Sequence, residues 1–132
     1  MTTVELAEYT MLKNAIAALE ARKEALIISA TSATRELKEA SSGGTGTVSD
    51  IVGNSGAKIA DIERMITQKK WEMEARLERI VEYVSGVSDA IVFTAMTLHY
   101  IDGLTWNEAA HRLNNTADSI RMAVSRYVDA HP

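Results

Sequence analysis

Arginine and hydroxyl side chains recur on one face of the segment from Ala117 to Val128 near the end of the chain. At 100° per residue a helix here presents one polar and one apolar arc. The polar arc consists of Asp118, Ser119, Arg121, Met122, Ser125 and Arg126. The apolar arc consists of Ile120, Ala123, Val124, Tyr127 and Val128.

The polar arc carries groups that suit contacts with duplex DNA. Arg121 could donate a bidentate pair of hydrogen bonds to guanine, and Ser119 or Ser125 could contact a base or a phosphate. Arg126, one turn after Arg121, is placed for a phosphate. Ala109 and Ala110, in the preceding helical segment, are small enough for two helices to cross closely, as a helix-turn-helix requires.

Charge argues against this interpretation. The chain has a formal net charge of −4, and from Ser88 onward five carboxylates face only three arginines, a local net charge of −2. Affinity for duplex DNA depends strongly on phosphate neutralisation. Asp118 suits a helix N-terminus but would repel a nearby phosphate. The alternatives are a protein-interaction module that does not read DNA, or a structural helical adaptor.

The sequence gives weaker signals for nucleotide binding, metal binding and catalysis. "GNSGAKI" lacks the Gly-Lys-Ser/Thr order of a phosphate loop, and no strand precedes it. His99, His111 and His131 do not form a metal-binding spacing. The carboxylates fall on helix faces exposed to solvent, and no nucleophile, base and orienting group stand together. We therefore expect no enzyme activity, no cofactor and no metal.

Composition predicts an all-α protein. The chain has 132 residues and its one proline is the last residue, Pro132, which favours uninterrupted helices. There is no cysteine, so a reducing cytoplasm is the expected compartment. The N-terminus does not resemble a signal peptide, and no apolar run approaches the roughly 20 residues of a membrane span.

Apolar periodicity predicts two long helices separated by glycines. The first covers residues 3–40, with a kink or break expected at 29–34, where β-branched residues and serines lower helix propensity. A flexible loop is expected at 41–50. The second helix is predicted securely over 57–84, while 51–56 is ambiguous. Two long amphipathic helices joined in this way predict an antiparallel hairpin.

The remaining third predicts short helices with tight connections. Ser88 is the expected N-cap of a helix over 89–101, and Gly103 is expected to end it in the left-handed conformation. Thr105 and Glu108 form a capping-box pattern. Asn114 and Asn115 supply a turn, after which Thr116 caps the last helix. The predicted domains are a helical hairpin at 1–86 and a helix-turn-helix at 87–132.

Some apolar residues suggest self-association. Trp71 fits either the core or an oligomer surface, whereas Met65, Met73 and Met96 are most simply core residues. The long first helix has more apolar positions than one partner helix covers, which favours a homodimer. A dimer would double the available arginines and match a palindromic site.

The segment "LHYIDGLTWNEAAHRLNNTADSIRMAVSRYV" resembles region 4 of bacterial sigma factors, and residues 20–128 resemble a family of small phage and prophage proteins with such an end. The matching residues in the middle of the chain are Ser49, Asp50, Gly53, Asn54, Ala57, Lys58, Asp61 and Glu63. At the other end they are Tyr100, Asp102, Gly103, Leu104, Thr105, Trp106, Glu108 and Ala109. Related phage regulators of the RinA and ArpU kind are thought to control late or lytic transcription.

The resemblance implies DNA binding through the last helix, with Ala117, Asp118, Arg121 and Met122 at the reading positions. The chain departs from the family pattern at His99, where arginine is usual, at Ala110, where isoleucine or valine is usual, and at Met122, which replaces a polar reader. These changes reduce base contacts and basic character.

Together, the residues and the resemblance predict an all-α chain in which a long antiparallel helical hairpin precedes a three-helix, sigma-region-4-like helix-turn-helix. The expected function is that of a phage transcription regulator in the bacterial host cytoplasm. Double-stranded DNA is the expected ligand, with host RNA polymerase or another host protein as a further partner. The alternatives are an interaction module that binds and inhibits a host factor, such as RNA polymerase or another regulator, and a structural adaptor of a virion or packaging complex. The predicted DNA-binding residues are Thr116, Ala117, Asp118, Ser119, Arg121, Met122, Ser125 and Arg126.

Overall fold

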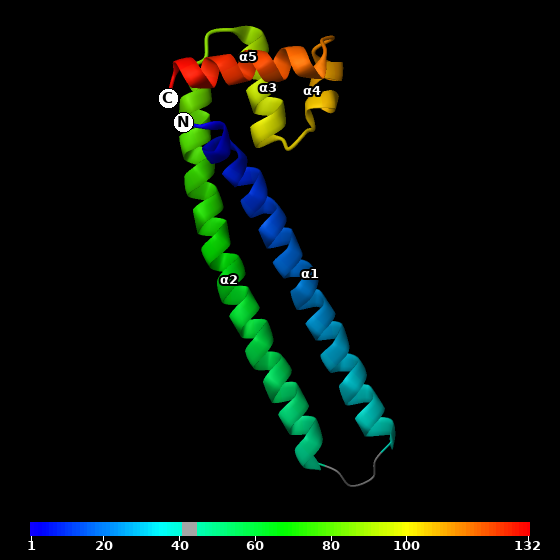
Figure 1. Cartoon of the computed structure of the whole chain (residues 1–132). Coiled ribbons are helices and arrows are strands. Elements are labelled where there is room, and N and C mark those ends of the chain that lie inside the picture. The colour runs from blue at the N-terminus through cyan, green and yellow to red at the C-terminus, as the bar shows by residue number, and fades with distance from the viewer. Residues whose placement is uncertain (41–44) are drawn as a thin grey trace. The chain divides into compact units, whose positions relative to one another are not determined.

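The computed structural model describes the backbone of residues 1–40 and 45–132, and the side chains of residues 1–32 and 54–132. Its elements, drawn in Figure 1, are α1 (Thr3–Ala40), α2 (Thr45–Ser85), α3 (Ala90–Met96), the π-helix η1 (Thr97–Ile101), α4 (Trp106–Arg112) and α5 (Ala117–Ala130). These described parts contain no strand, so the predicted all-α class is confirmed. None of their helices combines the length and apolarity that crossing a membrane would require.

α1 has its predicted bounds but not the expected break, and α2 begins earlier than its local sequence predicts. α1 continues without a break through residues 29–34, and the hydroxyl of Thr31 donates to the carbonyl oxygen of Ile27 at 2.8 Å. α2 begins at Thr45, so the expected loop is wrong for residues 45–50, whereas 41–44 lie outside the described residues. Propagating an existing helix costs far less than nucleating one, which explains why weak helix formers are included.

The chain divides into two compact units, and the division does not follow the order of the helices. The first unit comprises Met1–Lys13 and Glu72–Pro132, and the second comprises Asn14–Trp71. In the second unit Ile16 of α1 is buried, as are Ile62 and Ile66 of α2. Its ion pairs join Glu20 to Lys70 at 3.6 Å and Lys23 to Glu63 at 3.3 Å. As the residue numbers of the paired side chains rise along α1, those of their partners fall along α2, so the two helices are antiparallel within this unit.

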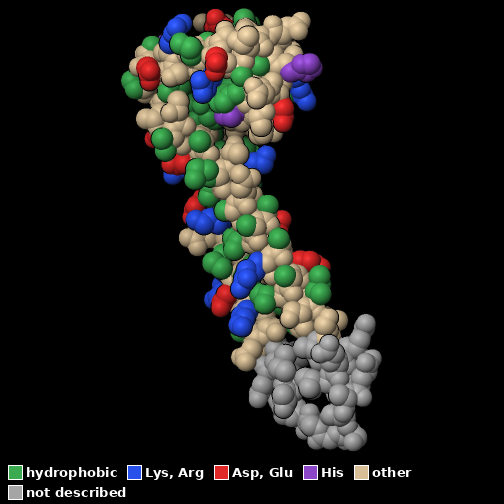
Figure 2. All heavy atoms as spheres, turned by 45° about the vertical axis from the view of Figure 1, so that its right-hand side comes forward, with side chains coloured by type: hydrophobic (Ala, Val, Ile, Leu, Met, Phe, Trp, Pro, Cys, Tyr) green, Lys and Arg blue, Asp and Glu red, His purple; other side chains and the backbone are tan. Residues whose placement is uncertain are grey.

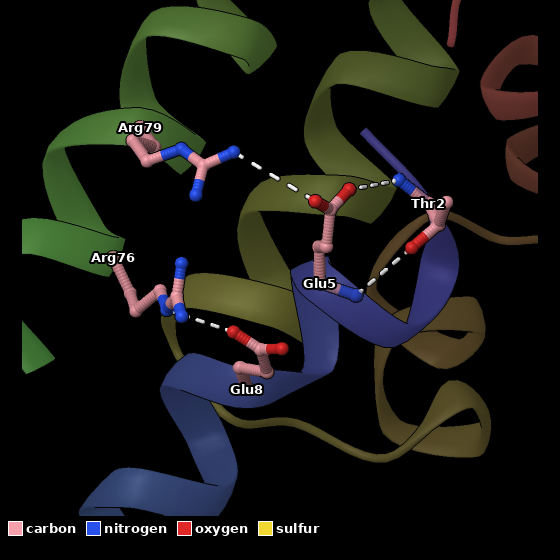
Figure 3. A network of polar contacts seen from close by, with 5 residues as sticks. All are labelled: Thr2, Glu5, Glu8, Arg76 and Arg79. Carbon is pink, nitrogen blue, oxygen red and sulfur yellow. Dashed lines mark hydrogen bonds and ion pairs between the residues drawn. The ribbon is translucent and has the colours of Figure 1, made fainter.

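The first unit contains a polar network between the start of α1 and the end of α2, drawn in Figure 3. Glu8 pairs with Arg76 at 2.7 Å and Glu5 with Arg79 at 3.7 Å. Glu5 also accepts a hydrogen bond from the Thr2 amide at 2.7 Å. That backbone hydrogen bond is the largest cause of a lowered pKa at Glu5, to which the N-terminal charge and Arg79 also contribute. The network pairs the two helix ends in an antiparallel register.

The core of the first unit draws on both long helices as well as the short ones. Leu6 of α1 and Ile80 of α2 are fully buried, as is Met96 at the end of α3. The rest of this cluster consists of Tyr9, Val84, Val87, Val92, Ala95, Tyr100, Ala109, Ala110, Ile120, Val124 and Val128. The division predicted after residue 86 follows a change in sequence pattern, whereas this apolar cluster includes side chains from both sides of that position. The ends of α1 and α2 therefore form part of the scaffold beneath α4 and α5.

The junction between α2 and α3 differs from its prediction by one residue. Asp89, not Ser88, is the N-cap: its carboxylate accepts from the amides of Ile91 at 2.9 Å and Val92 at 3.0 Å. A carboxylate satisfies two amides at once and also interacts favourably with the positive end of the helix. The prediction of Ser88 as the cap was therefore wrong.

The predicted helix over 89–101 changes character halfway. After Met96 it becomes the π-helix η1, and the amide of Asp102 donates to the carbonyl oxygen of Thr97, five residues back, at 3.0 Å. Gly103 then has a φ of 78°, which confirms the left-handed end predicted there. Since a wider turn changes the direction of the side chains that follow it, η1 decides where His99 and Tyr100 point.

Candidate nucleic-acid interface

Helices α4 and α5 are each started by a threonine, as predicted. The Thr105 hydroxyl accepts from the Glu108 amide at 3.1 Å, and the Thr116 hydroxyl accepts from the Ser119 amide at 3.2 Å. Between the helices Asn114 adopts a φ of 52°, a left-handed conformation that asparagine tolerates better than most residues. The connection is therefore short, and α4 and α5 contact one another.

The inner face of α5 packs as its periodicity predicts. Ile120, Val124 and Val128 are buried, while Ala123 and Tyr127 are partly buried. On α4, Ala109 and Ala110 are buried, which supports the predicted close crossing. Trp106 and Leu113 are partly exposed at the edge of the core.

The C-terminal end of α5 is held by aromatic contacts. The Tyr83 hydroxyl donates to the carbonyl oxygen of His131 at 2.7 Å, and the ring of Tyr83 meets that of Tyr127 edge-on at 6.0 Å between centroids. Burial is the main cause of a raised pKa at Tyr83. Because Tyr83 lies at the end of α2, this contact fixes α5 to the scaffold of the first unit.

The outer face of α5 is open to solvent, which is the property that the DNA-binding prediction requires. All six residues of the polar arc are exposed, as is the N-cap Thr116, and Ala117 is half-exposed. Met122 exposes 50% of its surface. The structure thus brings the predicted site residues together on one surface. Their binding of DNA stays a prediction.

Arg121 does not stand alone on this surface. Its guanidinium pairs with the carboxylate of Asp118 one turn earlier, at 3.0 Å. Both side chains are largely exposed, so the pair contributes little to stability and exchanges readily for another partner. In this arrangement Asp118 screens the arginine that was predicted to read a base.

A shallow hollow lies beside this pair, where the starts of α4 and α5 approach each other. It has a volume of about 300 Å³ and is lined by Thr105, Trp106, Asn107, Ala117, Asp118 and Arg121. Trp106 supplies the apolar part of its wall, and Asp118 and Arg121 supply one charge of each sign.

An aromatic cluster behind the hollow was missed in the sequence. His99 stacks on Trp106 with ring centroids 3.8 Å apart, and Tyr100 meets Trp106 edge-on at 5.8 Å. His99 Nδ1 lies 2.7 Å from the carbonyl oxygen of Leu104. His99 is half-buried in this cluster. The π-turn that creates the cluster has no simple signature in residue spacing.

Burial affects the titration of this cluster. It lowers the pKa of His99, against the smaller opposing effect of the hydrogen bond to Leu104. It also raises the pKa of Tyr100. Both shifts favour the neutral side chains, so the cluster adds no charge to the neighbouring surface near neutral pH.

Charges of both signs are mixed over the molecule. Figure 2 shows acidic and basic side chains interspersed over the visible face rather than a field of one sign. Within the residues whose side chains are described, no group of three or more His, Cys, Asp or Glu residues is arranged to hold a metal ion. Comparison of the chain with protein-family models, curated proteins and solved structures gave no match.

Proposed function

We propose that this chain is a phage-encoded transcriptional regulator that binds duplex DNA through α4, the turn after it and α5, used as a sigma-region-4-like helix-turn-helix. The observation that carries the proposal is the division of α5 into two faces. Its apolar face is buried in the core, while Ser119, Arg121 and Arg126 are exposed on the other. A rigid helix with an open polar face is what entry into the major groove requires.

In the proposed mechanism α5 lies in the major groove and Arg121 exchanges Asp118 for a base edge. Arg126 and Ser125 contact the backbone and fix the helix in register. Thr116 keeps the N-terminal turn of α5 formed, so that Ala117 can approach the DNA closely. The pair formed by α1 and α2 serves as a helical hairpin for dimerisation or for contact with RNA polymerase.

The proposal is tested by replacing both arginines. We expect Arg121→Ala/Arg126→Ala to weaken binding to duplexes selected from a random pool by about tenfold or more, since each arginine contributes a phosphate or base contact. Fluorescence anisotropy at several salt concentrations measures the affinity and its salt slope. Arg22→Ala/Lys58→Ala, which removes the same charge from exposed positions on α1 and α2, is the matched control. Equal binding by both double variants contradicts the mechanism.

A second candidate function is supported by Met122 and Asp118. A methionine that exposes half its surface at the centre of the outer face, next to an arginine already paired in the chain, suits a protein partner better than a phosphate backbone. In this alternative α5 binds a host factor, such as RNA polymerase or another regulator, and inhibits it. Pull-down from host lysate with and without nuclease separates the two. Capture that survives nuclease and high salt but is lost in Met122→Ala supports the protein partner.

A further inference from the structure

One face of α2 in the second unit has a large apolar side chain with nothing of its own unit to cover it. Trp71 exposes 73% of its surface, more than any other large hydrophobic side chain in the described part of the chain. It borders a hollow of about 790 Å³ lined by Ala60, Glu63, Arg64, Thr67, Gln68 and Trp71. All six belong to α2, and the spacing of four, three and four residues from Ala60 to Trp71 places them on one helix face.

From this face the geometry points to a binding surface for a second copy of the same chain. We propose that two copies pack their α2 helices antiparallel about a two-fold axis that passes between Met65 and Ile66. Trp71 of each copy then lies on Ala60 of the other, and Arg64 faces Thr67. The largest side chain of the face meets its smallest, so the six residues complement themselves as a symmetric interface requires.

Charge supports the same register. Glu63 and Lys70 lie on the same flank of this face, seven residues apart, and in an antiparallel pair residues on the same flank meet. Glu63 of one copy therefore faces Lys70 of the second copy, twice by symmetry. Within each copy Glu63 already pairs with Lys23 and Lys70 with Glu20. Docking would join these pairs into rows of alternating charge, Lys23–Glu63 followed by Lys70–Glu20 of the second copy.

A parallel arrangement of the same face is unfavourable. It would set Arg64 against Arg64 and Trp71 against Trp71, while the two Ala60 side chains would leave a gap. Like charges brought together at an interface are costly. Both the charges and the sizes of the side chains thus select the antiparallel pair.

The proposed interface is short, so the dimer is expected to be reversible. Three helical turns offer less contact than the total buried area of about 1,200–2,000 Å² found in stable complexes. We expect dissociation in the range of about 10–100 µM, since interfaces below that size are typically weak. Sedimentation velocity of the full chain from about 1 to 300 µM covers this range. A wild-type chain that stays monomeric throughout overturns the proposal.

Trp71→Ala provides the first variant. Because Trp71 is mostly exposed, the chain should fold as before, and we expect its dimerisation to weaken by about tenfold or more. Met65→Ala is the matched control, since Met65 lies on the same helix, exposes 44% of its surface and points away from this face. Dimerisation that survives Trp71→Ala, or fails equally in Met65→Ala, contradicts the assignment of the surface.

A mixing experiment tests the register itself. Glu63→Lys sets two lysines against each other across the interface, and Lys70→Glu sets two glutamates against each other, so each variant alone should dimerise weakly. In an equal mixture the heterodimer has opposite charges at both contacts, and its affinity should return to within about threefold of the wild type. In the mixture the Glu63→Lys chain still lacks its pair to Lys23, and the Lys70→Glu chain still lacks its pair to Glu20. Rescue can therefore only arise between chains. No rescue rejects the antiparallel register. None of these measurements uses DNA, so their outcome is independent of the proposed regulator function.

Discussion

His99 lies flat on Trp106, with ring centroids 3.8 Å apart and ring planes inclined by 18°. The imidazole comes from η1 and the indole from the first residue of α4, so the contact joins the two elements across the Gly103 turn. The hydrogen bond between His99 Nδ1 and the Leu104 carbonyl oxygen, at 2.7 Å, spans the same turn. His99 therefore contributes two contacts across this turn, beside the edge-on contact of Tyr100 with Trp106.

Acidification should destabilise the fold through His99. Because burial lowers the pKa of this residue in the folded state, the unfolded chain binds more protons below the ordinary value of 6.5. The contribution of His99 to stability is complete above pH 6.5 and is lost as the pH falls through the lower, folded-state pKa. Urea unfolding between pH 8 and pH 5 should show the midpoint falling in the wild type and falling less in His99→Gln. His111→Gln, on the exposed surface of α4, should behave as the wild type, and equal slopes in all three chains would disprove this role.

Two glycine-to-alanine substitutions should have opposite signs. Gly103 has a φ of 78° and Gly56 lies within α2, and in neither case would an added Cβ meet an atom within 4 Å. Steric clash therefore does not determine the effect of either substitution on stability, and the backbone conformation at each glycine does. Gly103→Ala should cost about 1–2 kcal/mol because it forces an L-residue into the left-handed region. Gly56→Ala should stabilise by about 0.5–1 kcal/mol because alanine is a better helix former. Chemical denaturation measures both, and a stabilising Gly103→Ala would contradict the positive φ.

The two faces of α5 should differ sharply in their tolerance of truncation. Ile120 exposes 1% of its surface and Met122 exposes 50%. Ile120→Ala should reduce the free energy of unfolding by about 2–5 kcal/mol, through lost burial and a cavity. Met122→Ala should change it by about 0.5 kcal/mol or less, as is usual for surface positions. Thermal or urea unfolding of the two variants is the measurement, and similar losses would mean that the outer face is covered.

Neutralising Asp118 should reveal which ligand α5 binds. In Asp118→Asn the side chain that pairs with Arg121 at 3.0 Å loses its negative charge. The repulsion between this side chain and a DNA phosphate is removed as well. If α5 reads DNA, duplex affinity should rise about 3- to 10-fold, equivalent to roughly 0.7–1.4 kcal/mol. Anisotropy with the selected duplex measures the change, and Asp129→Asn, exposed at the far end of α5, is the control. An unchanged or weaker affinity for Asp118→Asn argues against groove insertion by this face.

Short-range signals predicted several features that the structure confirms. Thr105 and Thr116 cap helices because a hydroxyl before a helix reaches amides only three residues away. Gly103 takes a positive φ for a similarly local reason. The apolar arc containing Ile120, Val124 and Val128 follows from helical periodicity alone. Each of these features depends on residues within one or two turns of each other.

Other positions were predicted wrongly for one of two reasons. Either their neighbours in the fold are distant in sequence, or two adjacent residues compete for the same role. Met65 was expected in the core, yet it exposes 44% of its surface, since hydrophobicity alone does not say which helix face finds a partner. For the same reason the sequence does not decide whether Trp71 lies in the core or on the surface. Ser88 and Asp89 are both good caps, and only the path of the backbone between α2 and α3 selects Asp89.

By itself the sequence determined that the chain is helical, where α4 and α5 begin, and which arc of α5 is apolar, because helix propensity, capping and periodicity act over a few residues. Tertiary structure decided that the ends of α1 and α2 share a core with α5, that His99 stacks on Trp106, and that Trp71 stays uncovered. The shared core depends on contacts between residues tens of positions apart, whereas the contact of His99 with Trp106, seven residues later, depends on the path of the backbone through η1 and the Gly103 turn. Such contacts arise only when the helices pack together to remove apolar surface from water.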